Sequence, residues 1–119
     1  MVVKSEAVTD GALTIWHNPR CSKSRQTLAL LHDRGLDPKV RLYLQDPPTR
    51  AQLRAALALL GQPAAALMRW NDSPLPRDAD EGAILEALAA DPRLIERPLV
   101  MTGTAAALGR PPEAVLALL

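Results

Sequence analysis

The sequence predicts a single α/β domain in which a block of helices separates two groups of β-strands. An apolar run at Leu13–Trp16 precedes a helical pattern at Ser22–Arg34, and an alternating run follows at Val40–Leu44. A helix between two strands indicates a right-handed βαβ unit whose strands are parallel. Helical patterns then fill much of residues 49–89, and another apolar run follows at Leu99–Met101. These observations predict a helical insertion between the second and third strands.

The first strand is preceded by a polar segment and followed by a well-marked helix. Residues 1–11 end in Asp10-Gly11, and we expect them to form a loose N-terminal arm. In the first helix, Leu28 and Leu31 make an apolar stripe, and Gly35 is a natural C-cap.

The insertion begins after Asp46-Pro47-Pro48, which ends the second strand. Thr49 caps a helix that runs to about Leu60, where Gly61 ends it. Four further segments complete the insertion: a short helix at Ala64–Arg69, a loop at Asn71–Arg77, a helix at Glu81–Ala89 capped by Asp80, and a turn at Asp91-Pro92.

The C-terminal part adds the remaining strands and a last helix. After the third strand, Ala105–Leu108 is either a short edge strand or a turn. The final helix opens at Pro111 or Pro112. Because no repeat and no long linker divides the chain, we expect one domain over residues 1–119.

Composition excludes several classes of protein. The chain carries 14 basic and 13 acidic residues, so a nucleic-acid partner is not expected, because such proteins usually have a strong basic excess. No apolar run approaches the ~20 residues of a membrane span, and the N-terminus lacks the apolar stretch of a signal peptide. One cysteine allows no intrachain disulfide, which fits a cytoplasmic location, and with two histidines it forms no recognised metal-ligand set.

The only cysteine, Cys21, lies where the first strand passes into the first helix. There the free backbone N–H groups and the positive end of the helix dipole favour the thiolate, and the same N–H groups can hold an oxyanion. A lone cysteine is more often a buried, inert small hydrophobe. These neighbours are instead polar and basic, which predicts a nucleophile. The nearby groups that could add positive charge, or be only solvated, are His17, Arg20, Lys23 and Arg25.

Five segments together resemble one known family. They are His17-Asn18-Pro19-Arg20-Cys21-Ser22-Lys23-Ser24-Arg25, Leu42-Tyr43-Leu44, Leu67-Met68-Arg69, Glu96-Arg97-Pro98-Leu99-Val100 and Gly109-Arg110-Pro111-Pro112. Their order and spacing over residues 13–119 resemble the glutaredoxin-coupled arsenate reductase (ArsC) family. The resemblance implies a thioredoxin-like fold, in which a mixed four-stranded sheet flanked by helices carries the predicted insertion.

The resemblance also implies roles for particular residues. Cys21 would be the nucleophile and His17 the catalytic histidine beside it. The arginines that hold the oxyanion would be Arg69, Arg97 and Arg110. Pro98 would be a cis-proline next to the active site. From the residues alone, His17 is either a satisfied structural histidine or an electrostatic tuner of the thiol.

The function implied is reduction of arsenate or a similar oxyanion. One cysteine cannot resolve its own adduct, so glutathione would act as co-substrate and glutaredoxin would regenerate the enzyme, with no bound cofactor. We expect a monomer without membrane or nucleic-acid partners. Two alternatives remain: a glutathione-dependent oxidoreductase without arsenate activity, and a regulator resembling the Spx transcription factors that bind RNA polymerase. Spx proteins often carry Cys-x-x-Cys, whereas Ser24 occupies that position here.

Overall fold

The computed structural model describes residue 9 and residues 11–119. Its centre is a four-stranded sheet with the strand order β2-β1-β3-β4. β1 (Thr14–Trp16) is parallel to β2 (Lys39–Arg41) and antiparallel to β3 (Leu99–Met101), and β3 is antiparallel to β4 (Ala106–Leu108). The expected mixed four-stranded sheet is therefore confirmed. Most of the predicted N-terminal arm, residues 1–8 and 10, lies outside the described residues.

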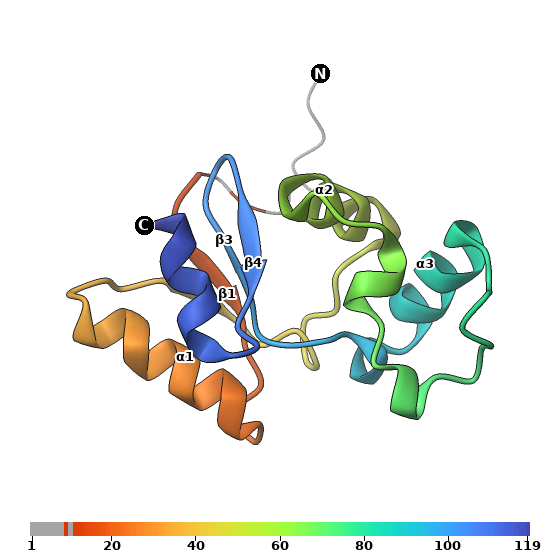
Figure 1. Cartoon of the computed structure of the whole chain (residues 1–119), viewed down its shortest axis with the longest axis horizontal. Coiled ribbons are helices and arrows are strands. Elements are labelled where there is room, and N and C mark those ends of the chain that lie inside the picture. Colours follow the sequence, from red (N-terminus) through yellow and green to blue (C-terminus); the bar gives the residue numbers. More distant parts are fainter. Residues whose placement is uncertain (1–8, 10) are drawn as a thin grey trace.

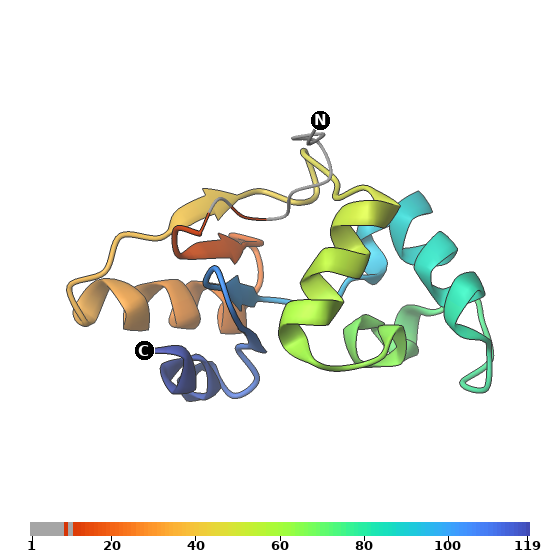
Figure 2. The ribbon, with the colours of Figure 1, turned by 90° about the horizontal axis from the view of Figure 1, so that it is seen from above.

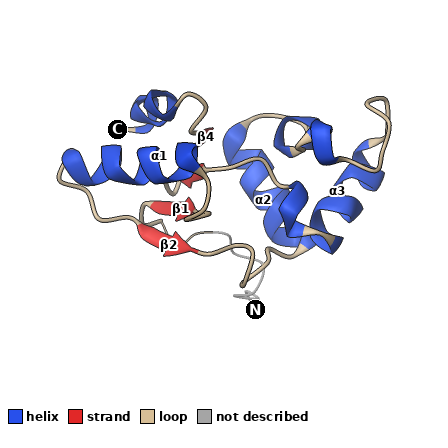
Figure 3. Ribbon diagram, turned by 90° about the horizontal axis from the view of Figure 1, so that it is seen from below, coloured by secondary structure: helices blue, strands red, loops and turns tan. Residues whose placement is uncertain are grey.

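The helices are divided between the sheet and the insertion. α1 (Ser22–Asp33) and the C-terminal 3₁₀ helix η5 (Pro112–Leu118) lie on one side of the sheet (Figure 3). The insertion, built around α2 (Arg50–Leu60) and α3 (Glu81–Ala90), forms a second lobe beside the sheet (Figures 1 and 2). Among the described residues, no helix is long and apolar enough to cross a membrane.

Short 3₁₀ helices link the longer elements of the insertion. They are η2 (Ala64–Leu67), η3 (Trp70–Asp72) and η4 (Pro92–Leu94). The turn predicted at Asp91-Pro92 is thus confirmed, whereas the short helix predicted to reach Arg69 ends two residues earlier. The segment predicted as a loop begins inside η3. Arg69 therefore lies between two 3₁₀ turns, and its backbone N–H donates to Leu94 O at 2.8 Å.

The sequence signals at the helix ends act as predicted. The Thr49 side chain accepts from Gln52 N, and Gln52 Oε1 accepts from Thr49 N, which together form a capping box at the start of α2. Gly61 ends α2 in the left-handed conformation, with φ of 69°. Asp80 caps α3 by accepting from Ala83 N at 2.8 Å.

Two apolar clusters cover the two faces of the sheet. Ile15 and Val100 point into the smaller cluster under α1 and η5, together with Leu31 and Val115. Their neighbours along β1 and β3 point the other way, into a larger cluster shared with the insertion. Members of that cluster from the strands are Trp16, Leu99 and Met101, and members from α2 and α3 are Leu53, Ala56, Leu57, Ile84, Leu85 and Leu88. One continuous core therefore joins the lobes.

The second strand is shorter than predicted. It ends at Arg41, because the backbone N–H groups of Gln45 and Asp46 both turn back to Leu42 O. Tyr43 consequently leaves the strand direction and is only 1% exposed. Alternation of apolar residues suits a strand and a compact turn equally well over so short a segment, so the pattern alone misplaced this end.

The C-terminal region resolves an open choice and corrects one expectation. Residues 106–108 form β4, so the edge-strand alternative is confirmed. The last helix is a 3₁₀ helix rather than an α-helix. The bond between Arg97 and Pro98 is cis, as expected, and the bond between Arg110 and Pro111 is also cis.

Candidate active site

Cys21 is the N-cap of α1, with φ and ψ of −96° and 123°, and it is partly exposed. Burial acts to raise the pKa of its thiol, but opposing contributions lower the pKa overall. These are, from the largest, the backbone amide of Ser24, the charge of Arg97, the backbone amide of Lys23 and the charge of Arg110. Backbone amides that point toward the sulfur favour the thiolate over the neutral thiol. The geometry agrees with the predicted nucleophile.

The positive charges that act on Cys21 differ from those nearest in sequence. Arg25 turns away, and its Nη1 donates to Pro19 O at 2.8 Å. Arg20 is exposed, and Lys23 contributes its backbone amide rather than its side chain. The charges that lower the pKa of the thiol come from residues some 75 to 90 positions later in the chain. Proximity in sequence was therefore a poor guide to electrostatics here.

His17 is buried and its ring is held by a serine. His17 Nδ1 lies 2.7 Å from Ser24 Oγ, and the same Oγ accepts from the backbone N–H of Asn18 at 3.0 Å. Burial, and then the charge of Arg25, lower the pKa of His17. A neutral ring that is bonded to Ser24 favours the structural alternative for His17. The ring contacts the side chain of Ser24, and the backbone amide of the same serine lowers the pKa of Cys21. A direct catalytic role for His17 stays a prediction.

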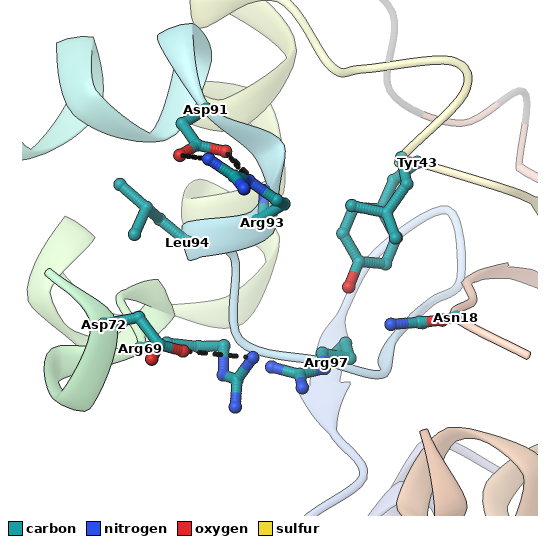
Figure 4. Close-up of a pocket in the computed structure, with 9 residues that line it drawn as sticks. Asn18, Tyr43, Arg69, Asp72, Asp91, Arg93, Leu94 and Arg97 are labelled. Carbon is teal, nitrogen blue, oxygen red and sulfur yellow. Dashed lines mark hydrogen bonds and ion pairs between the residues drawn. The ribbon is translucent and has the colours of Figure 1, made fainter. Parts of the chain in front are cut away.

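Arg97 is the most buried of the three predicted oxyanion arginines. It is 9% exposed, and its Nε and Nη1 have no hydrogen-bond partner among the described residues. It lines a cavity of about 420 Å³ together with Asn18, Tyr43 and Arg69 (Figure 4). Buried polar groups are nearly always paired. A guanidinium with unmet donors that faces a cavity is therefore suited to binding an anion there.

Arg69 and Arg110 complete this cationic region. Arg69 Nη1 lies 3.2 Å from Asp72 Oδ2 on the insertion side of the cavity (Figure 4). Arg110 and Arg69 also line a second, adjoining depression in the surface. Arg97 and Arg110 both act on the Cys21 thiol, and Arg69 lines the cavity of Arg97 as well as the depression of Arg110, whereas Cys21 itself lines neither of these two hollows. That all three arginines converge on the thiol stays a prediction.

Three residues of the motif segments lie at the site although no role was inferred for them from the sequence. Tyr43 faces Arg97 across the cavity, and burial raises the pKa of its hydroxyl. Asn18 points toward that hydroxyl (Figure 4). Glu96 could have been an ordinary solvated surface residue. In the structure its Oε1 instead lies 2.9 Å from Arg110 Nε. The one sequence signal for Glu96 was its position directly before Arg97. Among residues 9 and 11–119, no three metal-ligating side chains gather.

Comparison with known proteins now identifies the family. A sequence profile described as the ArsC family matches residues 16–118. The chain belongs to the ArsC family. This ArsC-family chain is 42% identical to the uncharacterized protein YfgD of Escherichia coli, over 86% of the chain and 92% of that protein. It is 38% identical to an arsenate reductase of Haemophilus influenzae, over 91% of the chain and 99% of that protein.

A solved structure supports the same assignment. The arsenate reductase from Vibrio cholerae superimposes with a TM-score of 0.81 at 39% identity, and the match covers 93% of this chain and all of that chain. The thioredoxin-like fold expected for an ArsC-family protein is thus confirmed. The family match over residues 16–118 includes Cys21 and the three arginines.

Proposed function

We propose that this ArsC-family chain is a thiol-dependent arsenate reductase in which the thiolate of Cys21 attacks arsenate. The observation that supports this most is Arg97, a buried guanidinium with unmet donors that lowers the pKa of the nearby thiol. An oxyanion beside this guanidinium would offset the cost of burying its charge. Relatives named arsenate reductase, at 38–40% identity, support the same reaction.

The three arginines would hold the oxyanion during attack. A guanidinium can bond two oxygens at once and keeps its charge, so Arg69, Arg97 and Arg110 suit a tetrahedral anion. They would also neutralise charge on the arsenic centre, which lets the thiolate approach and makes one oxygen a better leaving group. That oxygen would depart as water when the sulfur–arsenic bond forms.

The remaining electrons would come from thiols outside this chain. Reduction of arsenate to arsenite requires two electrons, which two thiols provide when they become one disulfide. Cys21 is the only cysteine, so the second thiol is external. We propose glutathione as this co-substrate and glutaredoxin as the protein that regenerates Cys21 by thiol–disulfide exchange. We also propose that the chain works in the cytoplasm as a monomer.

Substitution of Arg97 tests this function. Arg97→Ala is expected to lower arsenate turnover by roughly a hundredfold, the scale of losing one pre-organised oxyanion contact. Arg97→Lys should not fully restore it, because an ammonium cannot make the planar contact to two oxygens. The assay couples arsenite formation to NADPH oxidation through glutathione, glutaredoxin and glutathione reductase. The matched control is Arg54→Ala, which removes an exposed arginine of α2.

Full arsenate activity in Arg97→Ala would contradict the proposed site. Activity with a glutathione-linked disulfide but none with arsenate would instead favour the oxidoreductase alternative. That alternative needs Cys21 and does not need the three arginines.

A further inference from the structure

Glu96 places a carboxylate inside the cationic region of the site. Its Oε1 lies 2.9 Å from Arg110 Nε and 3.9 Å from Arg97 Nη1, so one oxygen reaches both arginines that act on Cys21. The Glu96 side chain is 25% exposed. Its backbone is fixed, because Glu96 N donates to Leu67 O. The carboxylate is therefore held in this place and is not a freely solvated charge.

The charges around the proposed anion site can be counted. Three guanidinium groups line it, and two carboxylates pair with them, Asp72 with Arg69 and Glu96 with Arg110. Of the other charged residues that line the two cavities, Asp91 pairs with Arg93 and Arg77 adds one further positive charge, so the arginines outnumber the carboxylates there. Arg97 is the arginine in this group whose donors lack hydrogen-bond partners within the described part of the chain.

We propose that Glu96 is a built-in counter-ion that tunes the anion site toward singly charged oxyanions and away from doubly charged ones. The inference rests on the proposed function only in placing the anion among Arg69, Arg97 and Arg110. A carboxylate beside the bound anion repels it in proportion to the anion's charge, so a dianion is penalised about twice as much as a monoanion. Selectivity then comes from a repulsive group as well as attractive ones.

The contacts of Glu96 fit this role better than a purely structural role in which Glu96 holds Arg110 in place. Its contact uses Nε of Arg110, which does not occupy the two terminal nitrogens of that guanidinium. The second arginine near Glu96 is Arg97, which burial next to Pro98 already holds in place. Loss of the carboxylate should therefore change the charge of the site more than its shape.

The test compares two tetrahedral anions that differ in charge, sulfate and perchlorate. Each is titrated as a protectant of Cys21 against iodoacetamide, a neutral reagent, at neutral pH and constant ionic strength. The concentration that halves the alkylation rate is measured for the wild type, Glu96→Gln, Glu96→Asp and the control Glu113→Gln. Glu113 is an exposed carboxylate of η5. Comparison between variants cancels the different hydration of the two anions.

Glu96→Gln should strengthen protection by sulfate about tenfold and protection by perchlorate about threefold, because the electrostatic gain scales with the charge of the ligand. Glu96→Asp keeps the charge and should retain the wild-type ratio, as should Glu113→Gln. Equal changes for both anions, or weaker binding of both in Glu96→Gln, would overturn the proposal. These results would leave the arsenate reductase function standing, because the readout does not depend on turnover. If neither anion protects Cys21 of the wild type from alkylation, the proposed anion site does not exist and the proposal fails with it.

Discussion

Cys21 is activated by groups that come from three separate parts of the chain. The first turn of α1 supplies the amides of Lys23 and Ser24, the segment before β3 supplies Arg97, and the segment after β4 supplies Arg110. A local motif provides only the first of these contributions. The pKa of this thiol therefore depends on the tertiary fold, and it should respond to substitutions far away in sequence.

Alkylation of Cys21 by iodoacetamide should have its pH midpoint below the free-thiol value of about 8.5. Arg110→Gln should move that midpoint upward, because it removes a positive charge that lowers the pKa of Cys21. Arg20→Gln serves as the control, since Arg20 is adjacent in sequence but exposed. A midpoint that shifts in Arg20→Gln and stays constant in Arg110→Gln would reverse the assignment of these charges.

His17 should make the stability of the protein depend on pH. Its pKa in the folded state is lowered from 6.5, so the unfolded chain takes up the proton first as the pH falls. The stability contributed by neutral His17 is complete above pH 6.5 and is lost as the pH falls from there toward the folded-state pKa. Urea denaturation at about pH 7 and about pH 5 measures this loss.

His17→Asn should reduce the pH dependence, because asparagine can place a hydrogen-bonding group near the position of Nδ1 without titrating. His32→Asn, at an exposed site on α1, should leave it unchanged. An identical fall in stability for His17→Asn and the wild type would show that another group is responsible.

Gly109, directly after β4, packs closely against α1. A Cβ at this position would lie 2.5 Å from Thr27 Oγ1 and 2.7 Å from Pro98 Cγ. Neither neighbour yields easily, since Thr27 Oγ1 is hydrogen-bonded to Lys23 O and the proline ring is rigid. Gly109 N also donates to Pro98 O at 2.9 Å. The glycine is therefore required by close packing beside the site, even though its φ is not in the left-handed region.

Gly109→Ala should destabilise the fold by about 1–3 kcal/mol, the usual cost of overpacking, and should lower turnover by displacing Pro98 and Arg110. Gly82→Ala is the matched control. Gly82 lies in α3, and a Cβ there would meet no atom closer than 3.7 Å. The substitution Gly82→Ala should therefore stabilise the protein by about 0.4–1 kcal/mol. Urea denaturation measures the free energy of unfolding of both variants, which should fall in Gly109→Ala and rise in Gly82→Ala. A stable, active Gly109→Ala would show that the close approach is absent.

Element boundaries were predictable where a cap marks them and unreliable where only periodicity does. Thr49, Gly61 and Asp80 mark the ends of α2 and the start of α3 correctly, because each satisfies specific backbone groups. The end of β2 carries no such mark. The Arg41 side chain helps to shape the turn that follows, since it donates to Asp46 O, Pro47 O and Gln52 Oε1. This network depends on tertiary neighbours that periodicity does not reveal.

For the whole molecule, the candidate site lies where the sheet and the insertion meet. Cys21, Arg97 and Arg110 flank strands of the sheet, whereas Arg69 belongs to the insertion. The cavity likewise has walls from both, with Tyr43 on one side and Leu94 on the other (Figure 4). The apolar cluster shared by the lobes therefore also determines how Arg69 is placed relative to the thiol.

The resemblance of five separated motifs predicted the family and the fold. The residues alone indicated Cys21, because its helix position can be read locally. They could not show that Arg97 is buried with unmet donors or that Glu96 pairs with Arg110, since both facts arise only when distant segments pack together.

In the proposed reaction, Cys21 and external thiols reduce an arsenate ion that three arginines hold. The most direct measurement is arsenate-dependent NADPH oxidation by the wild type and Cys21→Ser in the presence of glutathione, glutaredoxin and glutathione reductase. We expect NADPH oxidation that requires arsenate and every added component, and that is abolished in Cys21→Ser. An inactive wild type, or a Cys21→Ser variant that turns over arsenate at the wild-type rate, would contradict it.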